Sequence, residues 1–111
     1  MKIIDCCIFY NELNLLNYRL NLLDEVVDYF IIVESKHTFI GKEKKLYYDQ
    51  NKDIFEKFKD KIIHVIVDDF PFKYPFVNIQ KNEQWVNEYF QRNAISRGFK
   101  DINLTPQDII I

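Results

Sequence analysis

Short apolar runs rich in isoleucine and valine alternate with longer amphipathic segments in this sequence, and this alternation constrains its fold most. Residues 2–9, 26–34 and 62–67 form three such runs, each short enough to favour a strand over a helix. In the first run apolar residues face both ways, which is typical of a strand covered on both faces of a parallel sheet. Strands that alternate with helices pair in parallel through right-handed crossovers. We therefore predict an α/β fold with a mostly parallel sheet and flanking helices.

A leucine-rich segment after the first strand has the spacing of a helix. We predict a helix from residue 11 to about residue 24, with Asn11 as its N-cap. Its predicted buried stripe consists of Leu13, Leu16, Leu20 and Leu23, widened by Leu15, Tyr18 and Leu22. Arg19 lies inside this helix, and we interpret it as a surface residue that covers apolar neighbours.

Two further helices and two loops follow. The second predicted helix spans residues 51–60, and its inward residues are Ile54, Phe55 and Phe58. The third spans residues 83–97 and ends at Gly98, a good helix stop. Its predicted apolar stripe consists of Trp85, Val86, Tyr89, Phe90, Ala94 and Ile95. Residues 36–48 are a predicted loop, and residues 70–82 are another because prolines interrupt them.

The last residues, 108–111, have the pattern of the beginning of a fourth buried strand. A central parallel strand normally delivers a polar loop at its carboxyl end, and no residue follows Ile111. We therefore expect residues 1–111 to form a single, incomplete domain whose sheet is truncated after the fourth strand. A fragment of a longer chain is the favoured interpretation, and a short edge strand is the alternative.

Composition excludes several classes of protein. The chain is 48% hydrophobic and 29% charged, as expected of a globular domain, and its formal net charge of −2 argues against nucleic-acid binding. We find neither a secretory signal nor an apolar run of membrane-spanning length, which predicts a cytoplasmic protein. Cys6 and Cys7 are adjacent, and we expect them to be buried and unbridged. We interpret Lys42, Lys44 and Lys45 as part of a solvated loop.

Polar residues follow each of the first three predicted strands. They are Asn11 and Glu12 after the first, Glu34 and Ser35 at the end of the second, and Asp68 and Asp69 after the third. The carboxyl ends of parallel strands meet at one edge of the sheet, where open α/β proteins bind ligands. We therefore predict a binding site at this edge, beginning at Phe9 and Tyr10. Each polar residue also has a structural explanation, with Asn11 as a helix cap and the aspartates as turn formers.

Arg92 adds a candidate from the third helix. Glu88 lies four residues before it, so a surface ion pair is one interpretation. The functional interpretation is that the guanidinium reaches the sheet edge and meets a phosphate. The only glycines, Gly41 and Gly98, lie far apart in the sequence, which excludes a P-loop and a dinucleotide-binding fingerprint, and the two histidines are isolated.

Four segments of the chain carry a resemblance to a known family. They read DCCIFYNELNLLNYRLNLL, VVDYFIIVESKHTFIGKEKKLYY, FKDKIIHVIVDDFPF and EQWVNEYFQRNAI. In this order and spacing they resemble the N-terminal part of glycosyltransferase family 17, over nearly the whole chain. This family includes the transferase that adds the bisecting N-acetylglucosamine to the β-mannose of N-glycans.

The resemblance implies a GT-A type, Rossmann-like fold whose nucleotide-sugar-binding half lies in this chain. It also implies transfer of a sugar from a UDP-sugar, UDP-N-acetylglucosamine in the characterised members, to a glycan acceptor. By position, it implies that uridine is bordered by Phe9, Tyr10, Asn11 and Glu12, the base or ribose by Glu34, the base by Asp68, and the diphosphate or sugar by Arg92.

A divalent metal, Mn²⁺ or Mg²⁺, is implied as well. GT-A enzymes hold it through an Asp-x-Asp type motif just after the fourth strand, and residues 108–111 resemble the lead-in to that motif. We therefore expect the metal ligands and the catalytic base beyond Ile111, and no transferase activity from the 111 residues alone. Ile40 and Glu43 depart from the family pattern, in which threonine and proline are expected at these positions.

Two alternatives stay open from the sequence. One is a non-catalytic α/β remnant that binds a nucleotide or a partner and self-associates through its incomplete sheet. The other is a flavodoxin-like or receiver-like domain, which Asn11, Glu12 and Asp68 support only in part. Such a domain also requires one more strand and one more helix than this chain contains.

Overall fold

The computed structural model describes residues 1–111, with every side chain except that of Asp101. It confirms the α/β prediction: four strands form one sheet in the order β3-β2-β1-β4, and every pairing is parallel. The strands are β1 (Ile3–Phe9), β2 (Tyr29–Ser35), β3 (Ile62–Val67) and β4 (Ile109–Ile110). This architecture is consistent with one half of a Rossmann-like GT-A fold.

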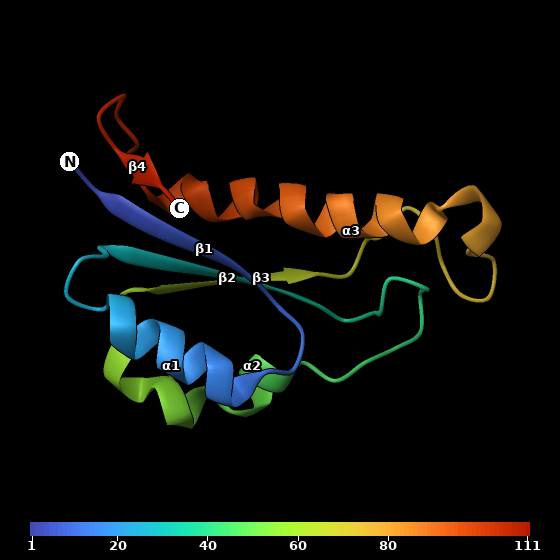
Figure 1. The fold of residues 1–111 in the computed structure, drawn as a ribbon, viewed down its shortest axis with the longest axis horizontal. Coiled ribbons are helices and arrows are strands. Elements are labelled where there is room, and N and C mark those ends of the chain that lie inside the picture. The colour runs from blue at the N-terminus through green and yellow to red at the C-terminus, as the bar shows by residue number, and fades with distance from the viewer.

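Helices cover both faces of the sheet (Figure 1). One face carries α1 (Leu13–Leu23), α2 (Tyr47–Gln50) and the 3₁₀ segment η1 (Lys52–Phe58), and the other carries α3 (Glu83–Asn93) and the 3₁₀ segment η3 (Ala94–Asp101). Residues of β2 alternate between the two layers: Phe30 and Ile32 pack on the α1 side, and Ile31 and Val33 on the α3 side. A short 3₁₀ turn, η2 (Ile79–Lys81), precedes α3. No helix in the described chain has the length and apolarity needed to cross a bilayer.

The prediction of a second helix over residues 51–60 is wrong in where the helix begins and in its being one regular α-helix. Helical structure begins earlier, at Tyr47, and after Asn51 it continues as a 3₁₀ segment with a kink at Phe55. Phe55 and Phe58 are buried, as predicted, because the three-residue repeat of a 3₁₀ helix places them on one side. Ile54 falls on the outer side, where 54% of it is exposed.

The predicted apolar stripe of α3 is wrong in its first two turns. Trp85 and Tyr89 are exposed, by 54% and 62%, and the buried positions are Asn87 and Gln91. Both amides donate hydrogen bonds to backbone carbonyls of the sheet or its loops. Buried backbone carbonyls need hydrogen-bond donors, and the face of α3 that supplies them, with Asn87 and Gln91, is the face that packs on the sheet.

Gly98 does not end the third helix, because η3 continues to Asp101. A Cβ atom at this position would lie 2.9 Å from Cγ2 of Ile31, which is fully buried. The glycine therefore permits close packing of η3 on β2, and its role is in helix–sheet contact.

Two expectations for α1 also need correction. Its N-cap is Glu12 and not Asn11, and no side chain caps the helix. The residues expected to widen the buried stripe, Leu15, Tyr18 and Leu22, are about two-thirds exposed. The apolar stripe of α1 is therefore wider than the part of the helix surface that packs on the sheet.

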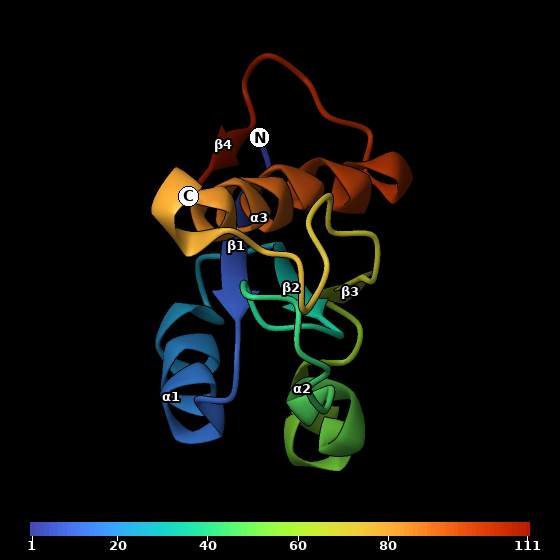
Figure 2. The ribbon, with the colours of Figure 1, turned by 90° about the vertical axis from the view of Figure 1, so that its right-hand side faces the viewer.

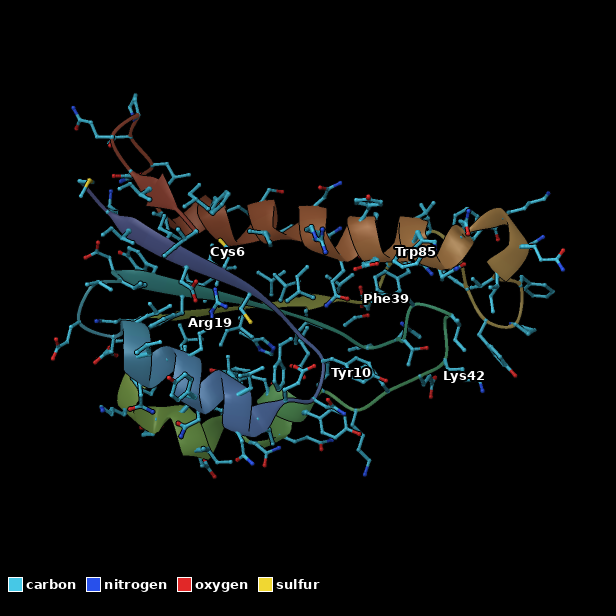
Figure 3. All side chains as sticks on the ribbon, in the orientation of Figure 1. Cys6, Tyr10, Arg19, Phe39, Lys42 and Trp85 are labelled. Carbon is cyan, nitrogen blue, oxygen red and sulfur yellow. The ribbon has the colours of Figure 1, made fainter. Side chains whose placement is uncertain are left out.

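Arg19 is bound to a buried partner, contrary to its interpretation as a surface residue. Its Nε donates to Oδ2 of Asp5 at 2.8 Å and its Nη2 to Oδ1 at 2.5 Å. Asp5 is 1% exposed and lies in β1, on the face of the sheet that α1 covers. Arg19 points from α1 toward the sheet in Figure 3. The neighbouring Cys6 and Cys7 are free thiols, half-buried, and burial raises the pKa of Cys6 to about 11.

Candidate functional site

The carboxyl ends of β1, β2 and β3 meet at one edge of the sheet, as predicted. Phe9 of β1 pairs with Glu34 of β2, and Glu34 pairs in turn with Ile66 of β3. Figure 2 views the molecule from this edge, which we call the rim. The segments 36–46 and 68–78, which leave β2 and β3, rise beside it and form its walls.

Four predicted site residues lie at the end of β1 and directly after it, and three of them are at the surface. Tyr10 is 45% exposed, at the turn where the chain passes from the sheet to α1 (Figure 3). Asn11 and Glu12 are exposed as well, and Oε2 of Glu12 accepts a hydrogen bond from the Tyr10 backbone at 3.4 Å. Phe9 instead belongs to the core below the rim and is 2% exposed.

Glu34 lies beneath the rim with no exposed surface. Its Oε1 accepts the Tyr48 N–H at 2.8 Å, and its Oε2 lies 2.9 Å from Nε2 of His64. The carboxylate thus links the end of β2 to α2 and to β3. Burial, with the nearby Glu34 charge as a further cause, raises the pKa of Tyr48 to about 12. The prediction that Glu34 faces a base or ribose stays a prediction, and its observed contacts are structural.

The two aspartates after β3 have different surroundings. Asp69 forms a two-point ion pair with Arg97, at 3.1 and 3.0 Å, and these hydrogen bonds lower the pKa of its carboxyl. Asp68 is exposed and lines both of the larger hollows at the rim. Of the two, Asp68 is therefore the one positioned to meet a ligand.

Arg92 lies apart from the rim. Its Nη2 donates to Glu88 at 3.3 Å and its guanidinium stands over the ring of Tyr89, so all three share the outer surface of α3. The structure thus has the helix-surface ion pair that was one of the two interpretations. A role for Arg92 at a phosphate stays a prediction.

Two hollows at the rim are joined by shared walls. The first, about 620 Å³, lies between segments 36–46 and 68–78 and includes Tyr74, so we call it the Tyr74 hollow. The second, about 550 Å³, reaches α2 and includes Lys44, so we call it the Lys44 hollow. His37, Glu43 and Asp68 line both. Together, the walls of the two hollows carry lysines, carboxylates and aromatic rings.

One buried amide fixes both walls. Asn87 of α3 is fully buried, and its side chain donates to the carbonyls of Phe39 and Phe72 at 2.8 and 2.9 Å and accepts from the Phe72 N–H at 3.1 Å. Gly41, with φ of +91°, lets the walls touch, since a Cβ there would lie 2.2 Å from the nitrogen of Tyr74. Sequence reasoning missed Asn87. The amides at positions 87 and 91, one helical turn apart, were the available signal.

Lys44 was also missed. It is not simply part of the solvated loop that the sequence predicts: the residue is half-buried, and its ammonium donates to the carbonyls of Ser35 and Lys45 at 3.0 and 2.9 Å. Burial lowers its pKa. No signal in the sequence separates it from Lys42 and Lys45, because its burial depends on the path of the segment after β2.

Metal ligation finds no support in the described side chains. Among them, no group of three or more histidine, cysteine, aspartate or glutamate residues is placed to hold a metal ion.

A sequence model of glycosyltransferase family 17 matches residues 1–111, the whole chain. The chain belongs to glycosyltransferase family 17. Its relatives include the beta-1,4-mannosyl-glycoprotein 4-beta-N-acetylglucosaminyltransferases of rat and human, each 26% identical over 99% of this chain, and that of mouse, 25% identical.

The chain spans about a fifth of the length of these curated relatives. No solved structure is significantly similar to it. The family match includes every residue of the rim, which is the place in the chain where strand ends and hollows converge.

Proposed function

We propose that this family 17 chain binds the nucleotide-sugar donor, UDP-N-acetylglucosamine, at the rim, in a protein that transfers the sugar to a glycan acceptor. The observation that carries the proposal is that the family match includes every residue that builds the rim. The relatives are named as N-acetylglucosaminyltransferases acting on a mannosyl glycoprotein, which supports this sugar and this class of acceptor.

Residues of the chain would bind and orient the donor. The exposed Tyr10 offers a ring on which a base or ribose can stack, and Asn11 and Glu12 beside it offer hydrogen-bonding groups. Asp68, which lines both hollows, offers carboxylate oxygens to ribose or sugar hydroxyls. Holding the donor rigidly against the sheet edge is how such a half-site contributes to transfer. A metal, when bound, would neutralise the leaving diphosphate.

Nuclear magnetic resonance titration of the 111-residue chain tests the proposal. We expect UDP-N-acetylglucosamine and UDP to shift resonances of Tyr10, Asn11 and Asp68, with Kd below about 1 mM, a binding free energy of about −4 kcal/mol. Tyr10→Ala should weaken binding at least fivefold, while Tyr18→Ala, which removes an exposed tyrosine of α1 outside the rim, should leave it unchanged. Absence of any rim shift at millimolar ligand would contradict the proposal.

A non-catalytic module that binds a nucleotide at the same hollows is the second candidate. It predicts donor binding too, so another measurement must separate it from the enzyme. The intact mass of the natural protein does so. A mass well above 13.5 kDa, with an acidic metal motif soon after residue 111, supports the transferase, and a mass of 13.5 kDa supports the binding module.

A further inference from the structure

Lys44 differs from the other half-buried cations of this chain. Five lysine and arginine side chains are partly buried: Lys2, Arg19, Lys44, Lys61 and Arg97. Four of them have an aspartate oxygen 3.7 Å or less from a side-chain nitrogen. Lys44 has no ion pair with any described side chain. A cation that folding has partly removed from water, without a paired anion, is costly unless a ligand pairs with it.

The ammonium of Lys44 is nevertheless held firmly in place. It donates to the carbonyls of Ser35 and Lys45, and it lies 5.2 Å from the ring centre of Tyr10 and 5.4 Å from that of Tyr47. Rings at this distance attract a cation through their quadrupoles. An ammonium has three N–H donors, and only two have partners among the described groups. One donor is left for a ligand.

The nearby carboxylates do not satisfy this charge. Glu34 and Glu12 favour the charged form of Lys44 at longer range, but burial outweighs them and its pKa is lowered. Both oxygens of Glu34 already have partners, the Tyr48 N–H and His64. Electrostatic attraction to an incoming anion is stronger at such a partly desolvated position than in bulk water.

We propose that Lys44 binds the diphosphate of the nucleotide donor, an inference that rests on the proposed function. Lys36 and Lys45 line the same hollow and add positive charge. The ring centre of Tyr10 lies 5.2 Å from the ammonium, which places a stacking surface near the anion site. Glu43 and Asp68 line the hollow too, where they can accept hydrogen bonds from ribose or sugar hydroxyls. The arrangement fits a ligand that joins a phosphate chain to a ring and to hydroxyl groups.

Calorimetric titration with UDP, uridine and inorganic pyrophosphate tests Lys44 in the 111-residue chain. Lys44→Met should weaken UDP and pyrophosphate binding at least tenfold and change uridine binding less than twofold. Lys44→Arg keeps the charge and should retain most of the UDP affinity. Lys59→Met makes the same charge change on the exposed side of η1, far from the rim, and should change nothing. Circular dichroism melts check that each variant is folded.

The outcomes separate this inference from the proposed function. If Lys44→Met weakens uridine and UDP equally, Lys44 acts only by supporting Tyr10, and the inference is overturned. Unchanged UDP binding in Lys44→Met overturns it as well. If the wild-type chain binds pyrophosphate through Lys44 but neither UDP nor uridine, the anion site stands and the proposed function fails. If the wild-type chain binds none of the three, both fail.

Discussion

The two buried carboxylates among the described side chains, Asp5 and Glu34, each have a charged or hydrogen-bonding partner, whereas the half-buried Lys44 has no ion pair with a described side chain. The Asp5–Arg19 pair and the Tyr48 N–H bond to Glu34 join helices to the sheet, and the Glu34–His64 contact joins β2 to β3. A buried charge costs free energy when it loses its partner, so single substitutions in such pairs have large and interpretable effects.

The Asp5–Arg19 pair gives the first prediction. Arg19→Met keeps the aliphatic stem but leaves the Asp5 carboxylate buried and unpaired, and we expect the free energy of unfolding to fall by about 3 kcal/mol. This is the low end for a broken buried pair, because 42% of the Arg19 side chain is exposed. Urea unfolding followed by tryptophan fluorescence measures the change.

A double variant provides the control for this prediction. Asp5→Asn with Arg19→Met removes both charges, so most of the lost stability should return. Lys59→Met breaks the solvent-exposed pair with Glu56 and should leave the unfolding curve unchanged. A double variant no more stable than Arg19→Met alone would show that the arginine contributes through packing and not through charge.

At the scale of elements, the strands were predictable and the inward faces of helices were not. The parallel direction of the strands follows from apolar runs alternating with helical segments, whereas their order, β3-β2-β1-β4, was known only from the structure. The face of α3 depended on Asn87, whose partners are backbone groups of two distant segments. Hydrophobic periodicity does not depend on those backbone groups, so it predicted that Trp85 and Tyr89 would be buried instead.

For the candidate site too, one part was predictable from the sequence and another was not. Its location was predictable, because parallel strands must end at one edge. Which side chains face the opening was not: Glu34 turned beneath the rim, and Lys44 became half-buried beside Tyr10. Both outcomes depend on how segment 36–46 folds back over β2, through contacts such as the hydrogen bond from the Lys44 backbone to Lys36. Local residue preferences do not specify such contacts.

Hydrogen bonds to the Asp108 carboxylate, next to β4, should make the stability of the chain depend on pH. Oδ2 of Asp108 accepts the Thr105 N–H at 2.9 Å, and Oδ1 accepts the Lys2 N–H at 2.8 Å, beside the pairing of β4 with β1. These backbone hydrogen bonds, Thr105 first, lower the pKa of Asp108 to about 2, from an ordinary value of about 3.9. The unfolded chain therefore binds the proton more readily, and this stabilisation is present above about pH 4 and is lost as the pH falls to about 2.

Thermal melts between pH 2 and pH 6 test this expectation. The wild-type melting temperature should fall through the acid range, and Asp108→Asn should show a lower melting temperature at pH 6 with a shallower fall. Asp53→Asn, an exposed aspartate of η1, should keep the wild-type profile. A carbon-13 titration that places the Asp108 midpoint near 4 would contradict the proposed cause.

At the scale of the whole molecule, one patch of exposed apolar surface lies between α1 and the edge of the sheet. Leu15, Tyr18 and Leu22 of α1 are exposed, and with Ile8 and Ile111 they line a hollow of about 590 Å³. Beside it, β4 is hydrogen-bonded to β1 alone in the described sheet. Contiguous apolar surface next to an edge strand favours association with another polypeptide.

Self-association of the 111-residue chain through this side, expected from the sequence, stays a prediction and can be measured. Sedimentation velocity should show a weight-average mass that rises above 13.5 kDa with concentration. Leu15→Lys with Leu22→Lys places two charges on the patch, so the rise should disappear. Ile79→Lys charges an equally exposed isoleucine of η2 and should leave the association intact. A wild-type chain that sediments at 13.5 kDa at every concentration would show that exposed apolar area alone is too small to drive pairing.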